Sequence, residues 1–261
     1  MNDTRPLVLK LGGRLLQEPA ALTDLLLICH QLKQQRTLLL VHGGGAQVDQ
    51  WLQQFGFSTE KIDGQRVSPA EQMPVICGAL AGAVNAELVG LAATVGLRPV
   101  GLTLAAGGSC HFQRNARLGA VANPKPGDPT LLQQLLAGNW MPVVSSIGHD
   151  EAGQLLNINA DLAAAALCQL LRGQLVLLTD VAGILDSHGE LVTELDSIQA
   201  SEMVARGVIQ GGMKVKLEAA LDTARALQDS IIVAGWQQPE TLLALLAGDA
   251  VGTRISIKQR D

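Results

Sequence analysis

Aromatic residues are scarce in this chain, and basic residues form no cluster. Its 261 residues include three Trp, three Phe and no Tyr, and the formal net charge is −5. Proteins that bind single-stranded nucleic acid stack bases on aromatic side chains, and nucleic-acid surfaces are generally basic. The composition therefore argues against nucleic acid and against an anionic membrane surface as partners.

The cysteines are few and far apart. None of the four forms a CxxC pair, and each has apolar or small neighbours, so we expect reduced thiols in or near the core. The N-terminal residues do not resemble a signal peptide, and no apolar run reaches the ~18 residues that span a bilayer. We therefore expect a cytoplasmic protein with no membrane partner. The cysteines are Cys29, Cys77, Cys110 and Cys168.

The common catalytic signatures are missing. The chain has no GxxxxGK(S/T) and no GxGxxG after a predicted strand, which argues against a P-loop NTPase and a nicotinamide-cofactor enzyme. HExxH and GxSxG are also absent. The histidines show no metal-ligand spacing, so no protein metal site is predicted and each histidine is expected at the surface or in a turn. They are His30, His42, His111, His149 and His188.

Short apolar runs alternate with segments of helical periodicity. At 48% hydrophobic and 16% charged residues the chain is globular, and the alternation predicts an α/β fold with a mainly parallel sheet covered on both faces. The pattern restarts near Gly173, which indicates a second lobe that continues the same sheet. The predicted strands are 7–11, 38–41, 99–104, 142–146, 175–179, 230–234 and a final edge strand 252–257, with helices over 19–35, 45–55, 130–136, 161–171, 198–206, 213–227 and 240–246.

Three further segments have local signals. Residues 58–67 predict a hairpin that turns at Asp63-Gly64. Ser68, Pro69 and Glu71 predict a capping box at the start of a long helix that reaches about Val95 and is weakened by two glycines. Residues 105–129 are rich in Gly, Pro and Asn and predict loops and short strands, forming a flap over a site.

A lysine interrupts the first buried strand. Lys10 follows three aliphatic residues and precedes Gly12 and Gly13, and a buried ammonium needs an anion close by. Glycine lets a ligand approach the backbone closely. A second glycine turn, Gly43–Gly45, follows the next predicted strand and precedes a helix, whose first N–H groups can bind an anion. Two such turns at strand ends indicate a polyphosphate site.

Four other polar residues have a structural and a functional interpretation. Lys216 is either a solvated lysine or faces a phosphate from the start of its helix. Asp161 either caps a helix or organises cations, and Asn157 is either a turn residue or a ligand-binding group. Arg66 is either a surface charge or a fork for a substrate carboxylate. Their residue types alone leave these alternatives open.

Several short motifs in one order resemble the amino acid kinase family, and within it the members that act on N-acetyl-L-glutamate. The resemblance covers nearly the whole chain. It rests on segments 10–13, 41–45, 63–67, 78–82, 142–148, 157–161, 179–185 and 212–216.

The resemblance implies an αβα three-layer sandwich with an open sheet. An N-terminal substrate lobe (1–172) and a C-terminal ATP lobe (173–261) would share this sheet. The implied reaction transfers the γ-phosphate of ATP, bound with Mg²⁺, to the γ-carboxylate of N-acetyl-L-glutamate. The product would be N-acetyl-L-glutamyl 5-phosphate, an intermediate of arginine biosynthesis. A homodimer is also implied.

The resemblance also implies residue roles. Lys10 and Lys216 would contact the transferring phosphoryl group, and Asp161 would hold the two lysines. Gly13, Gly44 and Gly45 would bind phosphate or substrate, and Arg66 and Asn157 would bind the α-carboxylate end of the substrate. The nucleotide would lie against Asp180, Val181, Ala182, Gly183, Ile184, Leu185, Val208, Ile209 and Gln210.

Two alternatives stay open at this point. A related carboxylate kinase would act on glutamate, aspartate or an aminoadipate derivative. A nucleotide-binding sensor would have lost catalysis, although Lys10, Lys216 and Asp161 are all present. The segment 105–109 lacks an acidic residue that we would expect from the family, and Ala122 stands where glycine is common, so the flap is where this chain departs from the pattern.

Overall fold

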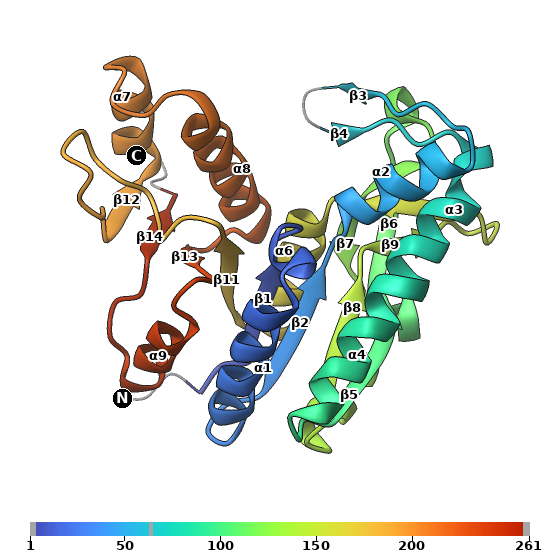
Figure 1. The fold of residues 1–261 in the computed structure, drawn as a ribbon, viewed down its shortest axis with the longest axis horizontal. Helices are drawn as coiled ribbons and strands as arrows, with labels where there is room; N and C mark the ends of the chain where they lie inside the picture. Colours follow the sequence, from blue (N-terminus) through green and yellow to red (C-terminus); the bar gives the residue numbers. More distant parts are fainter. Residues whose placement is uncertain (1–3, 63–64, 258–261) are drawn as a thin grey trace.

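One eight-stranded sheet runs through the whole molecule. The computed structural model describes residues 4–62 and 65–257 (Figure 1), and within helix α8 (Gly211–Leu227) it excludes the side chains of residues 211–213, 215 and 216. The strand order is β12-β14-β13-β11-β1-β2-β8-β5. The strands are β1 (Leu7–Leu11), β2 (Leu38–His42), β5 (Pro99–Thr103), β8 (Met141–Ser145), β11 (Gln174–Thr179), β12 (Glu194–Asp196), β13 (Ile231–Gly235) and β14 (Thr253–Ser256).

The predicted mainly parallel sheet is confirmed. All its strand pairs are parallel except β13 with β14. The prediction of an edge strand at the end of the chain is wrong, because β14 lies between β12 and β13. The edge strand β12 is only three residues long and contains two acidic residues, so its sequence gives no strand signal.

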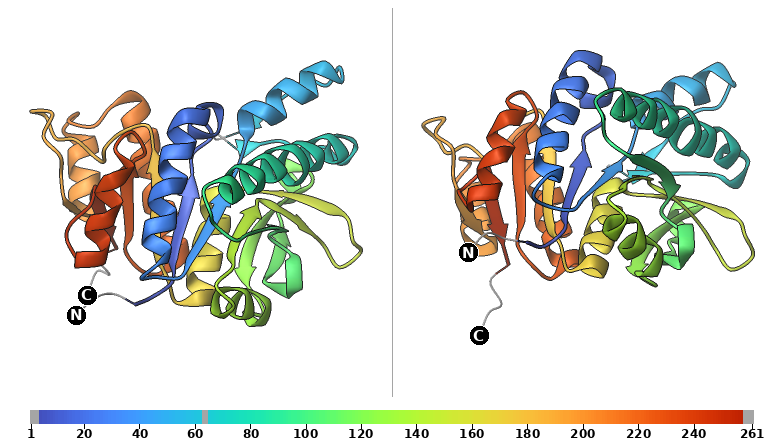
Figure 2. Two further views of the ribbon diagram at one scale, coloured as in Figure 1. Left: turned by 60° about the horizontal axis from the view of Figure 1, so that its bottom comes forward. Right: turned by 90° about the horizontal axis from the view of Figure 1, so that it is seen from below.

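Helices cover both faces of the sheet, as the alternation predicts. Helix α1 (Pro19–Lys33) lies on one face and α6 (Ala160–Leu171) on the other, as the turned views of Figure 2 show. On the first face Leu38 and Leu40 pack in one buried cluster with α1, α4 and α9, and on the second Leu39 and Val41 pack in another with α6 and α8. The other helices are α2 (Gly45–Gln54), α3 (Met73–Cys77), α4 (Asn85–Thr94), α5 (Thr130–Ala137), α7 (Ser197–Ala205) and α9 (Ala244–Ala247).

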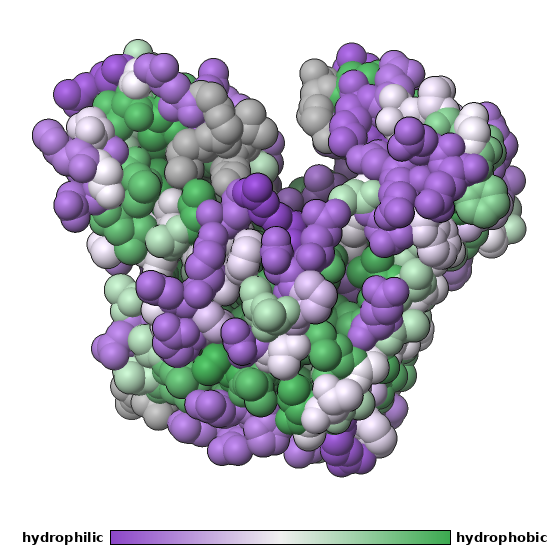
Figure 3. Space-filling view, viewed as in Figure 1, coloured by the Kyte–Doolittle hydropathy of each residue, from purple (hydrophilic) through white to green (hydrophobic). Residues whose placement is uncertain are grey.

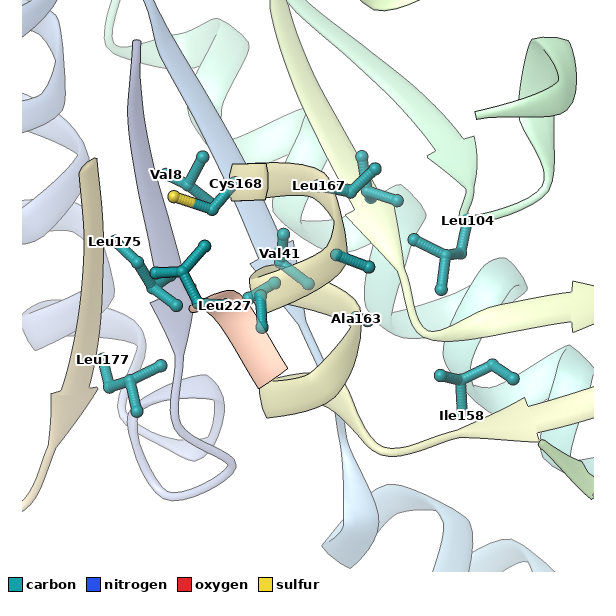
Figure 4. Packing of buried hydrophobic residues seen from close by; sticks show 14 of the residues in the cluster. Val8, Val41, Leu104, Ile158, Ala163, Leu167, Cys168, Leu175, Leu177 and Leu227 are labelled. Atoms are coloured by element: carbon teal, nitrogen blue, oxygen red, sulfur yellow. The ribbon is translucent and has the colours of Figure 1, made fainter. Parts of the chain in front are cut away.

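Helix α6 packs closely on the sheet because its buried side is small. Residues 163–166 are four consecutive alanines, all buried, and short side chains let a helix approach its neighbours. Figure 4 shows Ala163, Leu167 and Cys168 of this helix among strand residues and Leu227 of α8. This packing fixes the start of α6 at the carboxyl edge of the sheet.

The flap region forms a second, smaller sheet. Its strands are β6 (Cys110–Arg114), β7 (Val121–Pro126), β9 (Ile147–His149) and β10 (Leu155–Ile158), in the order β6-β7-β10-β9. Short strands were predicted for 105–129, and that prediction is confirmed. The predicted hairpin is also present as β3 (Lys61–Ile62) and β4 (Gln65–Arg66), while its turn, Asp63-Gly64, lies outside the described residues.

The long helix after the hairpin differs from prediction at its start and its middle. It begins as a 3-10 turn at Ala70 and continues through α3, a π-helical segment η3 (Gly78–Val84) and α4. The predicted capping box is wrong, because Ser68 is buried and its Oγ accepts a hydrogen bond from Asn157 Nδ2. Gly78 and Gly82, the two glycines expected to weaken the helix, lie in the π-helical segment.

The same helical stretch bears on the prediction about membranes. Residues Ala70–Thr94 are long and apolar enough to cross a bilayer by length and composition alone, so the expectation that no such stretch exists is wrong. A core helix passes the same test, and Ile76, Leu80 and Leu88 of this stretch pack in the buried clusters.

All four cysteines carry free thiols, as predicted. Three are buried and one is partly buried. Burial raises the pKa of Cys29, Cys110 and Cys168 to about 12, because a thiolate is poorly solvated in an apolar core. These thiols are therefore packing groups and poor nucleophiles.

Candidate active site

The carboxyl ends of β1, β2 and β11 meet at one edge of the sheet. The chain leaves these strands through Gly12-Gly13, Gly43–Gly45 and Asp180, respectively. Figure 3, in the same view as Figure 1, shows the molecule hollowed at this edge between two raised ends, one with α7 and α8 and the other with α2 and the β3–β4 hairpin. Ligands of open α/β sheets bind beyond such strand ends.

Lys10 pairs with a carboxylate from the facing helix. Its Nζ lies 2.8 Å from Oδ1 of Asp161, and both side chains are largely buried, at 16% and 25% exposed. Asp161 does not cap its helix, because Asn159 Oδ1 accepts the N–H groups of Asp161 and Leu162. The Asp161 carboxylate is thus left to the lysine, at the edge where the glycine turns meet.

The glycines of the two turns fall into two kinds. Gly12 and Gly44 are required by the fold: a Cβ on Gly12 would lie 2.9 Å from Leu178 O, and Gly44 has a φ of 149° and would bring a Cβ 2.9 Å from Leu80 Cδ2. A Cβ on Gly13 or Gly45 would meet no atom within 4 Å. Packing therefore does not explain these two glycines, whereas close approach of a ligand would.

A cavity of about 250 Å³ lies beside the second glycine turn. Gly44, Gly45, Arg66 and Asn157, all predicted substrate residues, line it together. Asn157 is held by its bond to Ser68 in the neighbouring segment. The structure thus brings to one cavity four residues that are up to 113 positions apart in the sequence.

Arg66 lies in the wall of this cavity, and its side chain is only 9% exposed. Its Nη2 is 2.6 Å from Asp49 Oδ1 of α2 and 3.3 Å from Gly45 O. Its Nη1 is buried and, among the described residues, has no hydrogen-bond partner. A buried cationic donor without a partner is costly, so this atom is suited to an incoming anion.

The predicted nucleotide residues are divided. Asp180, Val181 and Ala182 line a cavity of about 600 Å³ with residues from β13 and α9. Ile184 is buried, and its N–H donates to Thr253 Oγ1 at 2.7 Å. Gly183 has Leu191 and Thr253 against it, and Leu185 bridges to Leu191. Residues 183–185 therefore shape the turn beneath the cavity.

The second predicted nucleotide segment lies elsewhere. Val208, Ile209 and Gln210 connect α7 to α8 and do not line the cavity beside Asp180. Ile209 is buried, and Gln210 is the exposed N-cap residue of α8. Lys216 belongs to the same helix, and its side chain lies outside the described part of the structure.

A charged contact joins the first glycine turn to the turn after β11. Arg14 Nη1, after the first glycine turn, lies 3.2 Å from Asp180 Oδ2. Arg14 is 70% exposed, so solvent weakens the pair. In residues 4–62 and 65–257, no group of three or more His, Cys, Asp or Glu side chains could hold a metal ion.

The sequence prediction for His42 is wrong. This histidine is fully buried at the end of β2, with its ring between the Gly43 carbonyl and Asn85, and burial lowers its pKa to about 4. Asn85 and Asp49 were also missed. An asparagine in an otherwise apolar helical run, and a histidine next to a glycine turn, are the signals that could have indicated them.

The comparisons with known proteins agree with this architecture. A model of the amino acid kinase family matches residues 5–235. Acetylglutamate kinase from Moritella profunda is 48% identical over 256 residues, which cover 97% of each protein. The enzyme of the same name from Aeromonas salmonicida is 47% identical over 258 residues, which cover 98% of this chain and 100% of that protein.

Solved structures with lower identity share the fold. N-acetylglutamate synthase from Neisseria gonorrhoeae, solved with coenzyme A and N-acetyl-glutamate, has a TM-score of 0.76 at 22% identity, over 99% of this chain and 60% of that one. Carbamate kinase from Giardia lamblia bound to AMP-PNP has a TM-score of 0.59 at 16% identity, and the match covers 99% of this chain and 100% of that chain. With its family model covering most of its length and relatives nearly half identical throughout, this chain belongs to the amino acid kinase family.

Proposed function

We propose that this chain transfers the γ-phosphoryl group of ATP to the γ-carboxylate of N-acetyl-L-glutamate, giving N-acetyl-L-glutamyl 5-phosphate for arginine biosynthesis. The observation that carries the proposal is the 46–48% identity, over nearly the full chain, to several proteins named acetylglutamate kinase. The geometry of the carboxyl edge supports the chemistry, as follows.

The reaction needs compensation of charge and no general base. A carboxylate acceptor is ionised at pH 7, so no proton must be removed from it. It must instead approach a polyanion, and two unit charges ~4 Å apart interact by roughly 4 kcal/mol at an effective dielectric constant near 20. Lys10 and the N–H groups at the glycine turns offer positive charge and dipoles at this edge.

Asp161 would hold Lys10 in place. The 2.8 Å ion pair fixes the ammonium at the end of β1, and fixed charges stabilise a transition state without reorganising. Lys216 would be the second lysine that contacts the transferring phosphoryl group, a role that rests on the sequence resemblance. In-line positioning of the two substrates would contribute a further ~7–11 kcal/mol to catalysis.

The acceptor would occupy the cavity of about 250 Å³. Arg66, with its partnerless Nη1, would bind the α-carboxylate, and Asn157 would bind the same end of the molecule. Gly45 leaves space for the substrate against the start of α2. We assign the nucleotide to the other end of the hollow, with Asp180, Val181 and Ala182 on a cavity of ordinary size for a small-molecule site.

Mg²⁺ would arrive with the nucleotide. Mg²⁺ is commonly held by substrate phosphates, waters and one or two carboxylates, and the described residues offer no cage of three or more acidic, His or Cys ligands. This donor set fits an ion bound mainly by ATP, where it would neutralise phosphate charge. We also propose that the protein is a cytoplasmic homodimer, because the resemblance to the family implies it.

An acyl-phosphate assay tests the proposed function. The purified chain is incubated with ATP, Mg²⁺ and hydroxylamine, which traps an acyl phosphate as a hydroxamate. N-acetylglutamate, glutamate, aspartate and N-acetyl-aminoadipate are compared as acceptors. We expect product from N-acetylglutamate at the highest kcat/KM. Product from another acid and none from N-acetylglutamate would sink the proposal in favour of a related carboxylate kinase.

A further inference from the structure

His42 and Asn85 form a buried polar pair beneath the second glycine turn. His42 Nδ1 lies 2.8 Å from Gly43 O, and Asn85 Nδ2 lies 2.9 Å from His42 Nε2. Asn85 Nδ2 also donates to Val143 O at 2.9 Å. His42 has no exposed surface and Asn85 is 6% exposed, so neither touches solvent appreciably. The proposed function uses neither residue.

The hydrogen bonds define the protonation state of the ring. A carbonyl oxygen only accepts, so Val143 O requires the amide nitrogen of Asn85 on its side, and that nitrogen must donate to His42 Nε2 as well. Nε2 is therefore an acceptor, and the ring proton is on Nδ1, where it is donated to Gly43 O. The low pKa of His42, about 4, agrees with a neutral ring.

The hydrogen bond from His42 Nδ1 to the Gly43 carbonyl sets the orientation of the peptide group between Gly43 and Gly44. His42 follows Leu40 in strand alternation and so faces the α4 side of the sheet, where Asn85 lies. The chain has no cis peptide bond among its described residues, so the Gly44 N–H points opposite to the Gly43 carbonyl. That opposite side carries Val41 and the start of α6, next to the acceptor cavity.

The surroundings hold the pair in one arrangement. The π-helical segment η3 ends at Val84, immediately before Asn85, and presses Leu80 and Val84 against Gly44. A Cβ at Gly101 of β5 would overlap Asn85 Oδ1, so a glycine there makes room for the amide. Such π-helical turns are frequent at functional sites.

We propose that His42 and Asn85 are positioning residues that orient the Gly43–Gly44 peptide, so that the Gly44 N–H faces the acceptor and the transferring phosphoryl group. The proposal rests on the proposed function, since it names what aligns the glycine turn for that reaction. His42 does not touch substrate, and it acts through the Gly43 carbonyl.

Two amide substitutions separate the roles of the two ring nitrogens. In His42→Asn the amide nitrogen replaces Nδ1 and keeps a donor for Gly43 O, whereas in His42→Gln the longer amide replaces Nε2 and keeps a partner for Asn85 only. We expect His42→Gln to lower kcat by about 10- to 100-fold, below the ~10²–10³-fold cost of removing an oxyanion-type donor because the Gly44 N–H would be misaligned and not removed, and His42→Asn to lower it by less than about 5-fold. ATP affinity, measured by calorimetry, should stay within about twofold in both variants.

A purely structural role predicts a different pattern. The two variants would then lose the same activity, or lose it in proportion to their melting temperatures, and either result overturns the proposal. So does a larger loss of kcat in His42→Asn than in His42→Gln.

Two measurements that need no turnover also test the positioning role of His42. Long-range ¹⁵N–¹H spectra of wild type should show the Nδ1–H tautomer for His42, and the Nε2–H tautomer would overturn the proposal. Hydrogen exchange of the Gly43–Gly45 peptide should be faster in His42→Gln than in His42→Asn, and equal rates would contradict it. If wild type phosphorylates no N-acetylglutamate, the proposed function fails, while these two readouts still decide the role of His42.

Discussion

The two ends of the hollow are built in different ways. At the acceptor end, the Gly43–Gly45 turn is fixed from beneath by a buried histidine and from the side by Leu80 and Val84. At the nucleotide end, hydrogen bonds fix the turn after β11: Thr179 Oγ1 donates to Val181 O and accepts from the Val181 N–H, and the Ile184 N–H donates to Thr253 Oγ1 of β14. The charged contact between the first glycine turn and the nucleotide end, Arg14 with Asp180, is exposed on its arginine side.

The two ends differ in how far their turns can change conformation when a ligand binds. Buried side chains that contact a turn on several sides hold it in one geometry, because an interior is close-packed. An exposed ion pair contributes little and yields easily to a ligand. We therefore expect substitutions of the buried contacts at the acceptor end to affect both folding and catalysis, and substitutions of the exposed ion pair to affect neither strongly.

The largest effect should come from Lys10→Ala. Removing the cation at the centre of the edge should lower kcat by about 10²–10³-fold, because a fixed charge at the transferring group is lost. Initial rates at saturating substrates measure this, with calorimetry to show that ATP still binds. Lys214→Ala is the control, since Lys214 is 46% exposed and pairs only loosely with Glu218 at 3.8 Å. Equal rates for both variants would contradict a role for Lys10 in catalysis.

The next effect is a pH dependence of stability. The folded protein keeps His42 neutral down to a pKa of about 4, whereas an unfolded histidine titrates near 6.5, so the stabilisation is complete above pH 6.5 and is lost as pH falls toward 4. The shift corresponds to about 3 kcal/mol at most. Urea unfolding at several pH values between ~4.5 and ~7.5 gives the free energy of unfolding of wild type and of His42→Asn. This free energy should depend less steeply on pH in the variant than in wild type. His188 is exposed, so the control variant His188→Gln should keep the pH dependence of wild type. An equally steep pH dependence in His42→Asn would refute the assignment of the effect to His42.

Two neighbouring glycines sharpen the comparison further. Gly44→Ala should destabilise the protein by about 2 kcal/mol, since its φ of 149° suits glycine and the new methyl would press on Leu80 and Val84. Gly45→Ala should leave stability unchanged or slightly higher, because a Cβ there meets nothing and alanine favours a helix. Its KM for the acceptor should instead rise roughly tenfold through displacement of the substrate. Thermal unfolding and steady-state kinetics on both variants distinguish these outcomes, and equal melting temperatures would argue against the packing explanation.

The smallest effect should come from Arg14→Ala. Loss of an exposed ion pair should cost less than about 1 kcal/mol of stability and change the KM for ATP by no more than about threefold. Arg225→Ala, which removes an exposed pair with Asp222 elsewhere, is the matched control. A KM for ATP raised tenfold only in Arg14→Ala would mean that the nucleotide end is as dependent on side chains as the acceptor end.

The sequence predicts the layers of the fold and the place of the site. Strands β2 and β11 contain continuous buried aliphatic runs, and in β1 only Lys10 interrupts such a run, so these strands can be recognised without knowledge of their distant partners. The glycine turns follow these runs directly, and strand ends of a parallel sheet share one edge. The boundary between lobes near residue 173 stays a prediction, as do the catalytic and binding roles.

What the sequence does not predict depends on contacts between distant segments. The buried His42 has Asn85 of α4 as a partner, and the Asn85 amide is in turn held by Val143 O of β8, so the pair depends on residues far apart in the sequence. Ser68 has the residue type of a helix cap, yet its neighbours are Asn157 and the 118–120 segment. Polar residues have several local uses, and tertiary contacts select among them.

The order β11-β1-β2 in the sheet sets a distance scale for the proposed reaction. Neighbouring strands are ~4.8 Å apart, so the strand that presents the nucleotide turn and the strand that presents the acceptor turn are separated by roughly 10 Å. Lys10 is on the strand midway between them. The backbone hydrogen bonds of the sheet thereby fix the Cα atom of Lys10 between the two turns, and the ion pair with Asp161 then holds its ammonium.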